Sequence, residues 1–151
     1  HPNSKFAFVI NEVDSSITSF AYDAEAGKLT ELESVPTLPS DFTGENTTAE
    51  IAISQDGAYL YGSNRGHDSI VVYAVDAATG KLSLVEHVSA EGEHPRHFAL
   101  TPNGDYMLVA NRDTNNIVTF KVDKASGRLT YTGQQVTVSK PVCVQPFYFS
   151  V

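Results

Sequence analysis

This chain of 151 residues is poor in several residue types, and each scarcity narrows its function. It has a single cysteine, Cys143, so an internal disulfide framework is excluded and a reducing compartment is favoured. Its 10 lysine and arginine residues are outnumbered by 18 aspartate and glutamate residues, which gives a formal net charge of −8. No basic cluster is available to neutralise a phosphate backbone, so we expect no nucleic-acid partner.

Signals for membranes, metals and cofactors are missing as well. No apolar run approaches the length of a membrane span, and the first residues, His1 to Asn3, lack a signal-peptide pattern. We therefore expect a cytoplasmic protein with no membrane partner. Because the chain does not begin with methionine, we also expect its natural N-terminus to be missing. No His/Cys cluster has the spacing of metal ligands and no glycine-rich phosphate loop occurs, so neither a metal nor a cofactor is expected.

What the chain does contain is a pattern that occurs three times. Each copy has an asparagine at the end of an apolar run, an isoleucine six residues later, an aromatic residue three further on, and then a Gly-Lys-Leu or Gly-Arg-Leu motif. The asparagines are Asn11, Asn64 and Asn111, and the motifs begin at Gly27, Gly80 and Gly127. The landmarks therefore recur after 53 and then 47 residues. A period of this size, filled with short β-type runs, predicts the blades of a β-propeller.

Each copy reads as four short antiparallel strands. In the third copy we expect strands at 97–100, 106–110 and 117–122 and a fourth that opens at 128–132. Asn103-Gly104 is a strong hairpin signal between the first two strands. No stretch has helical periodicity over three turns, so the chain is expected to be all-β.

The copies predict one partial propeller of about three blades. Its approximate boundaries are 1–48, 49–95 and 96–140, followed by a closing strand in 141–151 that starts around Val142 to Val144. Three blades would leave two apolar blade faces exposed, and such faces drive association. Two chains could therefore close a six-bladed ring.

Polar residues gather where a propeller places its chemistry. The first strand of each blade lines the channel and the second returns, so the start of the first and the end of the second meet at one channel mouth. The residues expected there are the pairs Ala49-Glu50, Arg96-His97 and Val142-Cys143 at the strand starts, and Asn11-Glu12, Asn64-Arg65 and Asn111-Arg112 at the strand ends. His67 lies in the turn after Arg65, and the long 36–48 connection belongs to the same rim. Carboxylates, guanidiniums, imidazoles and amides at one concave site form a plausible pocket.

Each of these residues also has a structural interpretation. The recurring asparagine is suited to tying down the turn that follows it. Glu50 lies in an apolar strand start, where a carboxylate is costly unless it is paired, for example with Arg65 or Arg96. His97 is equally suited to being a satisfied channel histidine, and His67 to being a turn residue. Cys143 is expected to be a small buried hydrophobe with no base beside it.

Several strings resemble the seven-bladed β-propeller lactonase family, which includes 6-phosphogluconolactonases and carboxy-cis,cis-muconate lactonizing enzymes. The strings are Phe42-Thr43-Gly44-Glu45-Asn46, Ala49-Glu50-Ile51, Ser54-Gln55-Asp56-Gly57, Asn64-Arg65-Gly66-His67-Asp68-Ser69-Ile70, Pro95-Arg96-His97-Phe98 and Pro141-Val142-Cys143-Val144. The resemblance implies a C-terminal fragment, since seven repeats need roughly 330 residues. One position departs from the family pattern, because Ala52 stands where a histidine usually follows Glu-Ile.

The resemblance also implies an activity, the hydrolysis of a sugar lactone such as 6-phosphogluconolactone. Glu50 or Glu12 would then act as the base, and Arg65 would stabilise the oxyanion. The residues expected to bind the substrate, a small anionic lactone or sugar phosphate, are Arg96, Asn64, Asn11, His97 and His67. Two alternatives stay open at this point, a muconate-lactonizing cycloisomerase and a non-enzymatic propeller that serves as a binding module. The isolated fragment is expected to be inactive.

Overall fold

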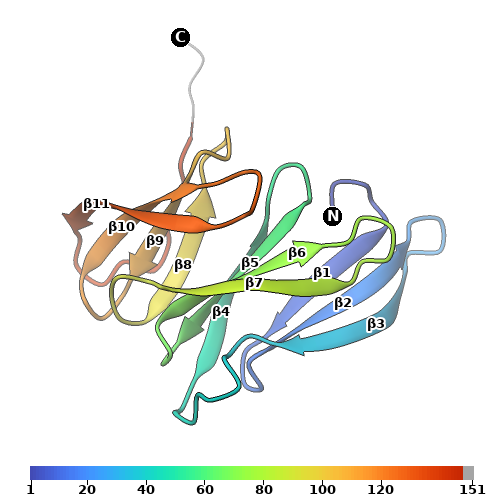
Figure 1. The fold of residues 1–151 in the computed structure, drawn as a ribbon, viewed down its shortest axis with the longest axis horizontal. Helices are drawn as coiled ribbons and strands as arrows, with labels where there is room; N and C mark the ends of the chain where they lie inside the picture. Colours follow the sequence, from blue (N-terminus) through green and yellow to red (C-terminus); the bar gives the residue numbers. More distant parts are fainter. Residues whose placement is uncertain (148–151) are drawn as a thin grey trace.

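The computed structural model describes residues 1–147, which form three antiparallel sheets placed one after another in chain order (Figure 1). The first sheet contains β1 (Phe6–Asn11), β2 (Ser16–Asp23) and β3 (Lys28–Pro36). The second contains β4 (Thr47–Ile53), β5 (Tyr59–Arg65), β6 (Ser69–Val75) and β7 (Leu82–Ser89). The third contains β8 (Pro95–Leu100), β9 (Tyr106–Asn111), β10 (Asn116–Val122) and β11 (Leu129–Thr137). Within each sheet every strand pairs with the next along the chain, so the second and third sheets are four-stranded propeller blades and the first is a three-stranded one.

The all-β fold and the partial propeller are therefore confirmed, and residues 1–147 contain no helix. In particular, this part of the chain has no helix that is long and apolar enough to span a membrane. Residues 141–147 contain no strand, so the strand expected around Val142 to Val144 does not form there, and the rest of the expected closing segment, 148–151, lies outside the described residues. A strand is held by hydrogen bonds to a neighbour's backbone, and no strand in residues 1–147 pairs with this segment.

The core lies in the two seams between neighbouring blades. The seam between the first and second blades buries Ile17, Leu60, Val71, Tyr73 and Leu82. The seam between the second and third is larger and contains the fully buried rings of Tyr61, Phe98 and Phe120. The middle blade is covered on both faces, and this is why β5 and β6 are almost continuously buried while β1 is mostly half-buried.

Contacts across the seams repeat with the sequence period. The Glu33 carboxylate accepts the backbone N–H of Leu82 at 2.6 Å, and 53 residues later the Glu86 carboxylate accepts that of Leu129 at 2.9 Å. An aromatic ring also covers the last turn of the next blade. A Cβ added to Gly80 would lie 2.4 Å from the Phe6 ring, and one added to Gly127 would lie 2.3 Å from the Tyr59 ring.

Three glycines at one repeat position test whether these seams hold the blades together. Gly27, Gly80 and Gly127 have positive φ angles of 62°, 72° and 72°, so alanine strains the backbone at each, by about 1–2 kcal/mol. A Cβ at Gly27 would meet nothing within 4 Å, and Gly27→Ala should show this backbone cost alone. Gly80→Ala and Gly127→Ala should lose about 1–3 kcal/mol more, because the aromatic ring must move. Urea unfolding measures the free energies, and equal losses at all three positions would contradict the seam contact.

Candidate active site

A bulge at the start of β4 positions Glu50. In the β4–β5 ladder Thr47 pairs with Arg65, but the register then shifts, so that Ile51 pairs with Gly62 and an extra residue is accommodated beside Glu50. The backbone N–H of Glu50 donates to the Ser63 hydroxyl at 2.9 Å within this irregularity. Bulges redirect side chains at strand ends and next to active sites.

The third blade repeats this arrangement. Pro95 pairs with Asn111 and His97 with Ala110, which leaves Arg96 as the extra residue of β8. The start of the first strand and the end of the second therefore meet in both blades, as the sequence predicts. Arg96 is exposed there.

Glu50 pairs with His97 rather than with the arginines named from the sequence. The His97 Nε2 atom lies 3.1 Å from Glu50 Oε2, across the seam between the second and third blades. The other oxygen, Oε1, accepts the backbone N–H of Ile51 at 3.1 Å. The Glu50 side chain keeps 28% of its surface exposed, so the carboxylate is oriented and still reachable from solvent.

Arg65 joins Glu12 instead, across the seam between the first and second blades. Its Nη2 atom donates to Glu12 Oε1 at 2.5 Å and to the backbone oxygen of Thr48 at 2.5 Å. The hydrogen bond and charge of Arg65 lower the pKa of Glu12, and the charge of Arg96 adds to this. The Arg65 side chain is only 10% exposed, whereas that of Glu12 is 66% exposed.

Two of the recurring asparagines, Asn64 and Asn111, connect neighbouring blades. The amide of Asn64 donates to the backbone oxygen of Thr37 at 2.8 Å, and that of Asn111 donates to the oxygen of Ala90 at 2.8 Å. Both acceptors follow the last strand of the preceding blade. Asn64 also donates to Ser69 in its own turn, which is the role that the sequence suggested.

The side-chain amide of Asn11 has no such partner within residues 1–147, and its hydrogen bonds lie within the first blade. Its amide donates to the hydroxyls of Ser16 and Thr18, each at 2.9 Å. The substrate-binding role predicted for Asn64 and Asn11 thus competes with hydrogen bonds that already occupy their amide groups.

His67 contacts the long connection between the first two blades. Its ring meets Phe42 edge-on with centroids 4.9 Å apart, and its Nδ1 atom lies 2.7 Å from the Ser69 hydroxyl. The backbone N–H of His67 donates to the side chain of Asn46 at 3.1 Å. The substrate-binding role of His67 stays a prediction, while its contacts with the rim loop are those of a structural residue.

Cys143 differs from its expected environment. It is exposed rather than buried, and its sulfur lies 3.9 Å from His97 Nε2. The error follows from the missing strand, because a cysteine in a paired channel strand would have been covered. An imidazole therefore lies beside this thiol, where the sequence suggested none.

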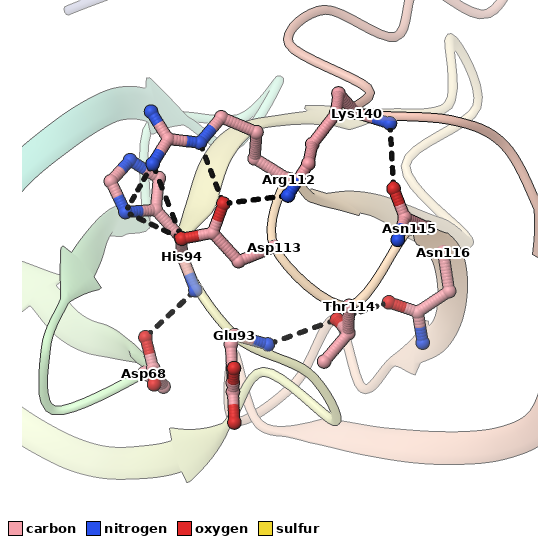
Figure 2. A network of polar contacts seen from close by, with 9 residues as sticks. All are labelled: Asp68, Glu93, His94, Arg112, Asp113, Thr114, Asn115, Asn116 and Lys140. Atoms are coloured by element: carbon pink, nitrogen blue, oxygen red, sulfur yellow. Dashed lines mark hydrogen bonds and ion pairs between the residues drawn. The ribbon is translucent and has the colours of Figure 1, made fainter.

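A second polar network, not anticipated as a unit, lies between the second and third blades (Figure 2). Arg112 grips Asp113 through Nε at 2.8 Å and Nη2 at 3.2 Å, and Lys140 approaches the same carboxylate at 3.4 Å. The hydrogen bond from Arg112 is the main cause that lowers the pKa of Asp113 to about 2. His94 Nδ1 lies 3.6 Å from Asp113. The signal in the sequence was Arg112, which occupies the repeat position of Arg65 and Glu12.

Residues 1–147 contain no group of three or more His, Cys, Asp or Glu side chains that could hold a metal ion. A pocket of about 310 Å³ lies at the turns that follow β4 and β8, where Tyr59, Tyr61 and Leu100 line it. These turns are at the opposite end of the strands from Glu50, and none of the predicted site residues lines the pocket. The candidate site therefore rests on polar contacts rather than on a cavity.

Comparison with known proteins identifies the family. The sequence profile described as "Lactonase, 7-bladed beta-propeller" matches residues 1–146. The chain belongs to the seven-bladed β-propeller lactonase family. It is 40% identical over 145 residues to the 6-phosphogluconolactonase of Bacillus subtilis, a match that covers 96% of the chain and 42% of the relative.

Solved structures of similar proteins superpose closely on this lactonase-family chain. A protein from Lactobacillus plantarum has a TM-score of 0.90 at 40% identity, over 94% of the chain and 41% of that structure. The periplasmic gluconolactonase of Pseudomonas aeruginosa has a TM-score of 0.89 at 35% identity, over 95% and 39% respectively. The chain thus spans less than half the length of each of these relatives.

Two histidines near the blade ends, His87 and His94, have lowered pKa values in the folded chain. Burial is the main cause that lowers the pKa of His87, and the charge of His67 lowers it further. The Thr37 carbonyl, 3.1 Å from His87 Nε2, raises this pKa. Burial and then the Arg112 charge lower the pKa of His94. The charges of Asp113 and Asp68 raise the pKa of His94, and the charge of Arg65 lowers it.

We therefore expect the chain to become more stable as pH rises from about 5.5 to 7.5. A histidine with a lowered folded-state pKa takes up its proton more readily when unfolded, so the stability it contributes is present above about 6.5 and is lost as pH falls below that value. The variants His87→Gln and His94→Asn should each flatten this rise; asparagine suits position 94 because φ there is 58°. Urea unfolding at pH 5.5, 6.5 and 7.5 measures the slope, and an unchanged slope in both variants would refute the assignment.

Proposed function

We propose that this chain carries catalytic residues of a lactone hydrolase whose substrate is a sugar lactone such as 6-phosphogluconolactone. The observation that carries the proposal is the Glu50 carboxylate, which is held by one protein donor on each oxygen and remains partly exposed. The 40% identity to a 6-phosphogluconolactonase supports the substrate class. The reaction needs a base, an electrophilic stabiliser and an anion clamp, and all three residue types occur at these strand ends.

Glu50 acts as the general base in this proposal. It takes a proton from a water molecule while the water oxygen attacks the ring carbonyl. The tetrahedral oxyanion that forms is stabilised by a guanidinium. When the ring C–O bond breaks, the leaving oxygen takes up a proton and the open hydroxy acid is released.

Glu12 is less suited to be the base. Arg65 and Arg96 lower its pKa, and a carboxylate with a lowered pKa has less affinity for a proton from water. Its ion pair with Arg65 instead holds the guanidinium at the strand end. In this proposal Arg65 stabilises the oxyanion, and the exposed Arg96 binds the negative group of the substrate.

The activity should depend on Glu50 and Arg65. Glu50→Gln removes the base without changing the size of the side chain and should lower kcat by about 10²- to 10⁴-fold. Arg65→Ala should lower kcat by a similar factor, about 10²- to 10³-fold, if it stabilises the oxyanion. Because the isolated chain is expected to be inactive, lactone hydrolysis is assayed on the longest reading frame that contains it.

The control is Glu25→Gln, the same change at an exposed turn carboxylate, which should leave kcat unchanged. A larger loss of kcat in Glu12→Gln than in Glu50→Gln would assign the role of general base to Glu12. Full activity in both Glu50→Gln and Arg65→Ala would remove the site assignment. Turnover of carboxy-cis,cis-muconate by the same protein would instead indicate the cycloisomerase reaction.

We also propose that the chain self-associates through its two outer blade faces, and that it is cytoplasmic, as its low cysteine content suggests. Large apolar side chains lie exposed on both outer blades, among them Val9 at 43%, Tyr22 at 40%, Tyr106 at 41% and Val136 at 58%. Exposed apolar patches of this kind favour association.

Light scattering should therefore give the mass of a dimer or a larger oligomer, well above the 16.3 kDa of one chain. Val9→Lys should shift the chain toward the monomer, because it places a charge on the outer face of the first blade. Val13→Lys is the matched control, since Val13 is 87% exposed in a turn and should have no effect. A monodisperse monomer of the unaltered chain would contradict the proposal.

A further inference from the structure

One repeat position carries three chemically different side chains, and the middle one, His97, contacts the other two. Glu50 and His97 occupy equivalent repeat positions at the bulges of β4 and β8, and Cys143 is the next residue of the same pattern. His97 lies between the other two, because its Nε2 atom is 3.1 Å from the Glu50 carboxylate and 3.9 Å from the Cys143 sulfur. The three side chains therefore form a row that crosses from the second blade to the third and on to the segment after it.

The backbone fixes which nitrogen of His97 carries the proton. The N–H of Val144 points at His97 Nδ1 over 3.3 Å, and an amide N–H can only donate. Nδ1 must then accept, so a neutral imidazole carries its proton on Nε2. That proton faces Glu50 Oε2, and the contact needs no charge on the histidine.

The same contacts make His97 a poor candidate for the base itself. Both ring nitrogens are engaged, and the side chain is only 14% exposed, compared with 28% for Glu50. The carboxylate is the more open of the pair. Because each of its oxygens is held by one donor, from Ile51 on one side and His97 on the other, its plane is set while lone pairs remain for a water molecule.

We propose that His97 is a positioning residue that orients Glu50 for proton abstraction, with the Val144 N–H selecting the tautomer that can do so. This inference rests on the proposed function of Glu50. It also assigns a function to the segment after the third blade, because this segment supplies the Val144 N–H that reaches His97.

Substitutions at His97 separate positioning from a purely structural role. His97→Ala removes the donor and should lower kcat by about 10- to 100-fold, with a smaller change in KM, since Glu50 loses its orientation. His97→Gln keeps an N–H donor at a similar reach and should recover most of the loss. Cys143→Ala is the control, because it removes the other neighbour of Nε2 and leaves Glu50 held; its kcat should stay close to that of the unaltered protein.

A double variant shows whether His97 acts through Glu50. In the Glu50→Gln background, His97→Ala should cause no further loss of kcat, because the base is already absent. Multiplicative losses, or a His97→Gln variant no better than His97→Ala, would overturn the proposal. A normal kcat in Glu50→Gln alone would instead refute the proposed function.

The tautomer of His97 can be measured without an activity assay. Long-range ¹H–¹⁵N spectra of the chain at alkaline pH, where imidazoles are neutral, should show His97 with a protonated Nε2 and an unprotonated Nδ1. Glu50→Ala should shift the Nε2 proton signal because it removes the acceptor, whereas Cys143→Ala should leave its tautomer unchanged. The opposite tautomer in the unaltered chain would overturn the assignment even if no lactone is hydrolysed.

Discussion

Packing of each blade against the next is the constraint on which the rest of this structure depends. A four-stranded sheet with apolar side chains on both faces cannot bury them alone, so the two seams supply the core of the described chain. Hydrogen bonds across the seams fix how neighbouring blades are aligned. A carboxylate of one blade accepts a backbone N–H of the next, and an amide of the next blade donates to a backbone oxygen of the first.

The candidate site depends on these seams because its side chains come from different blades. Glu50 belongs to the second blade and its donor His97 to the third, while Arg65 of the second blade holds Glu12 of the first. A shift of about 1 Å between neighbouring blades would separate such pairs, and misplacement of this size lowers rates by orders of magnitude. The amides of Asn64 and Asn111 bridge the same two seams at the ends of β5 and β9, so they stabilise the site without contacting its carboxylates.

Much of the fold could be predicted from the sequence, because the three copies share a period and each carries its own turn residues. The strands of the third blade lie within two residues of their predicted starts, and the meeting of strand ends followed from the direction of the strands. Partners across a seam could not be predicted in this way. The period shows that Glu50 and His97 are equivalent, but whether they touch depends on blade rotation and rotamers. The exposure of Cys143 was missed for a related reason, since it depends on whether its segment finds a partner strand.

The three copies also show which repeat positions the fold requires and which can vary. The position of Asn11, Asn64 and Asn111 keeps its amide in every copy, because the seams and turns use it. The next position holds Glu12, Arg65 and Arg112, and the channel position holds Glu50, His97 and Cys143. Side chains of opposite charge and different size at one repeat position mean that folding does not require any one of them. Their identities are therefore free to serve binding and catalysis, and the contacts between unlike neighbours in adjacent copies are the interactions that a single blade could not provide.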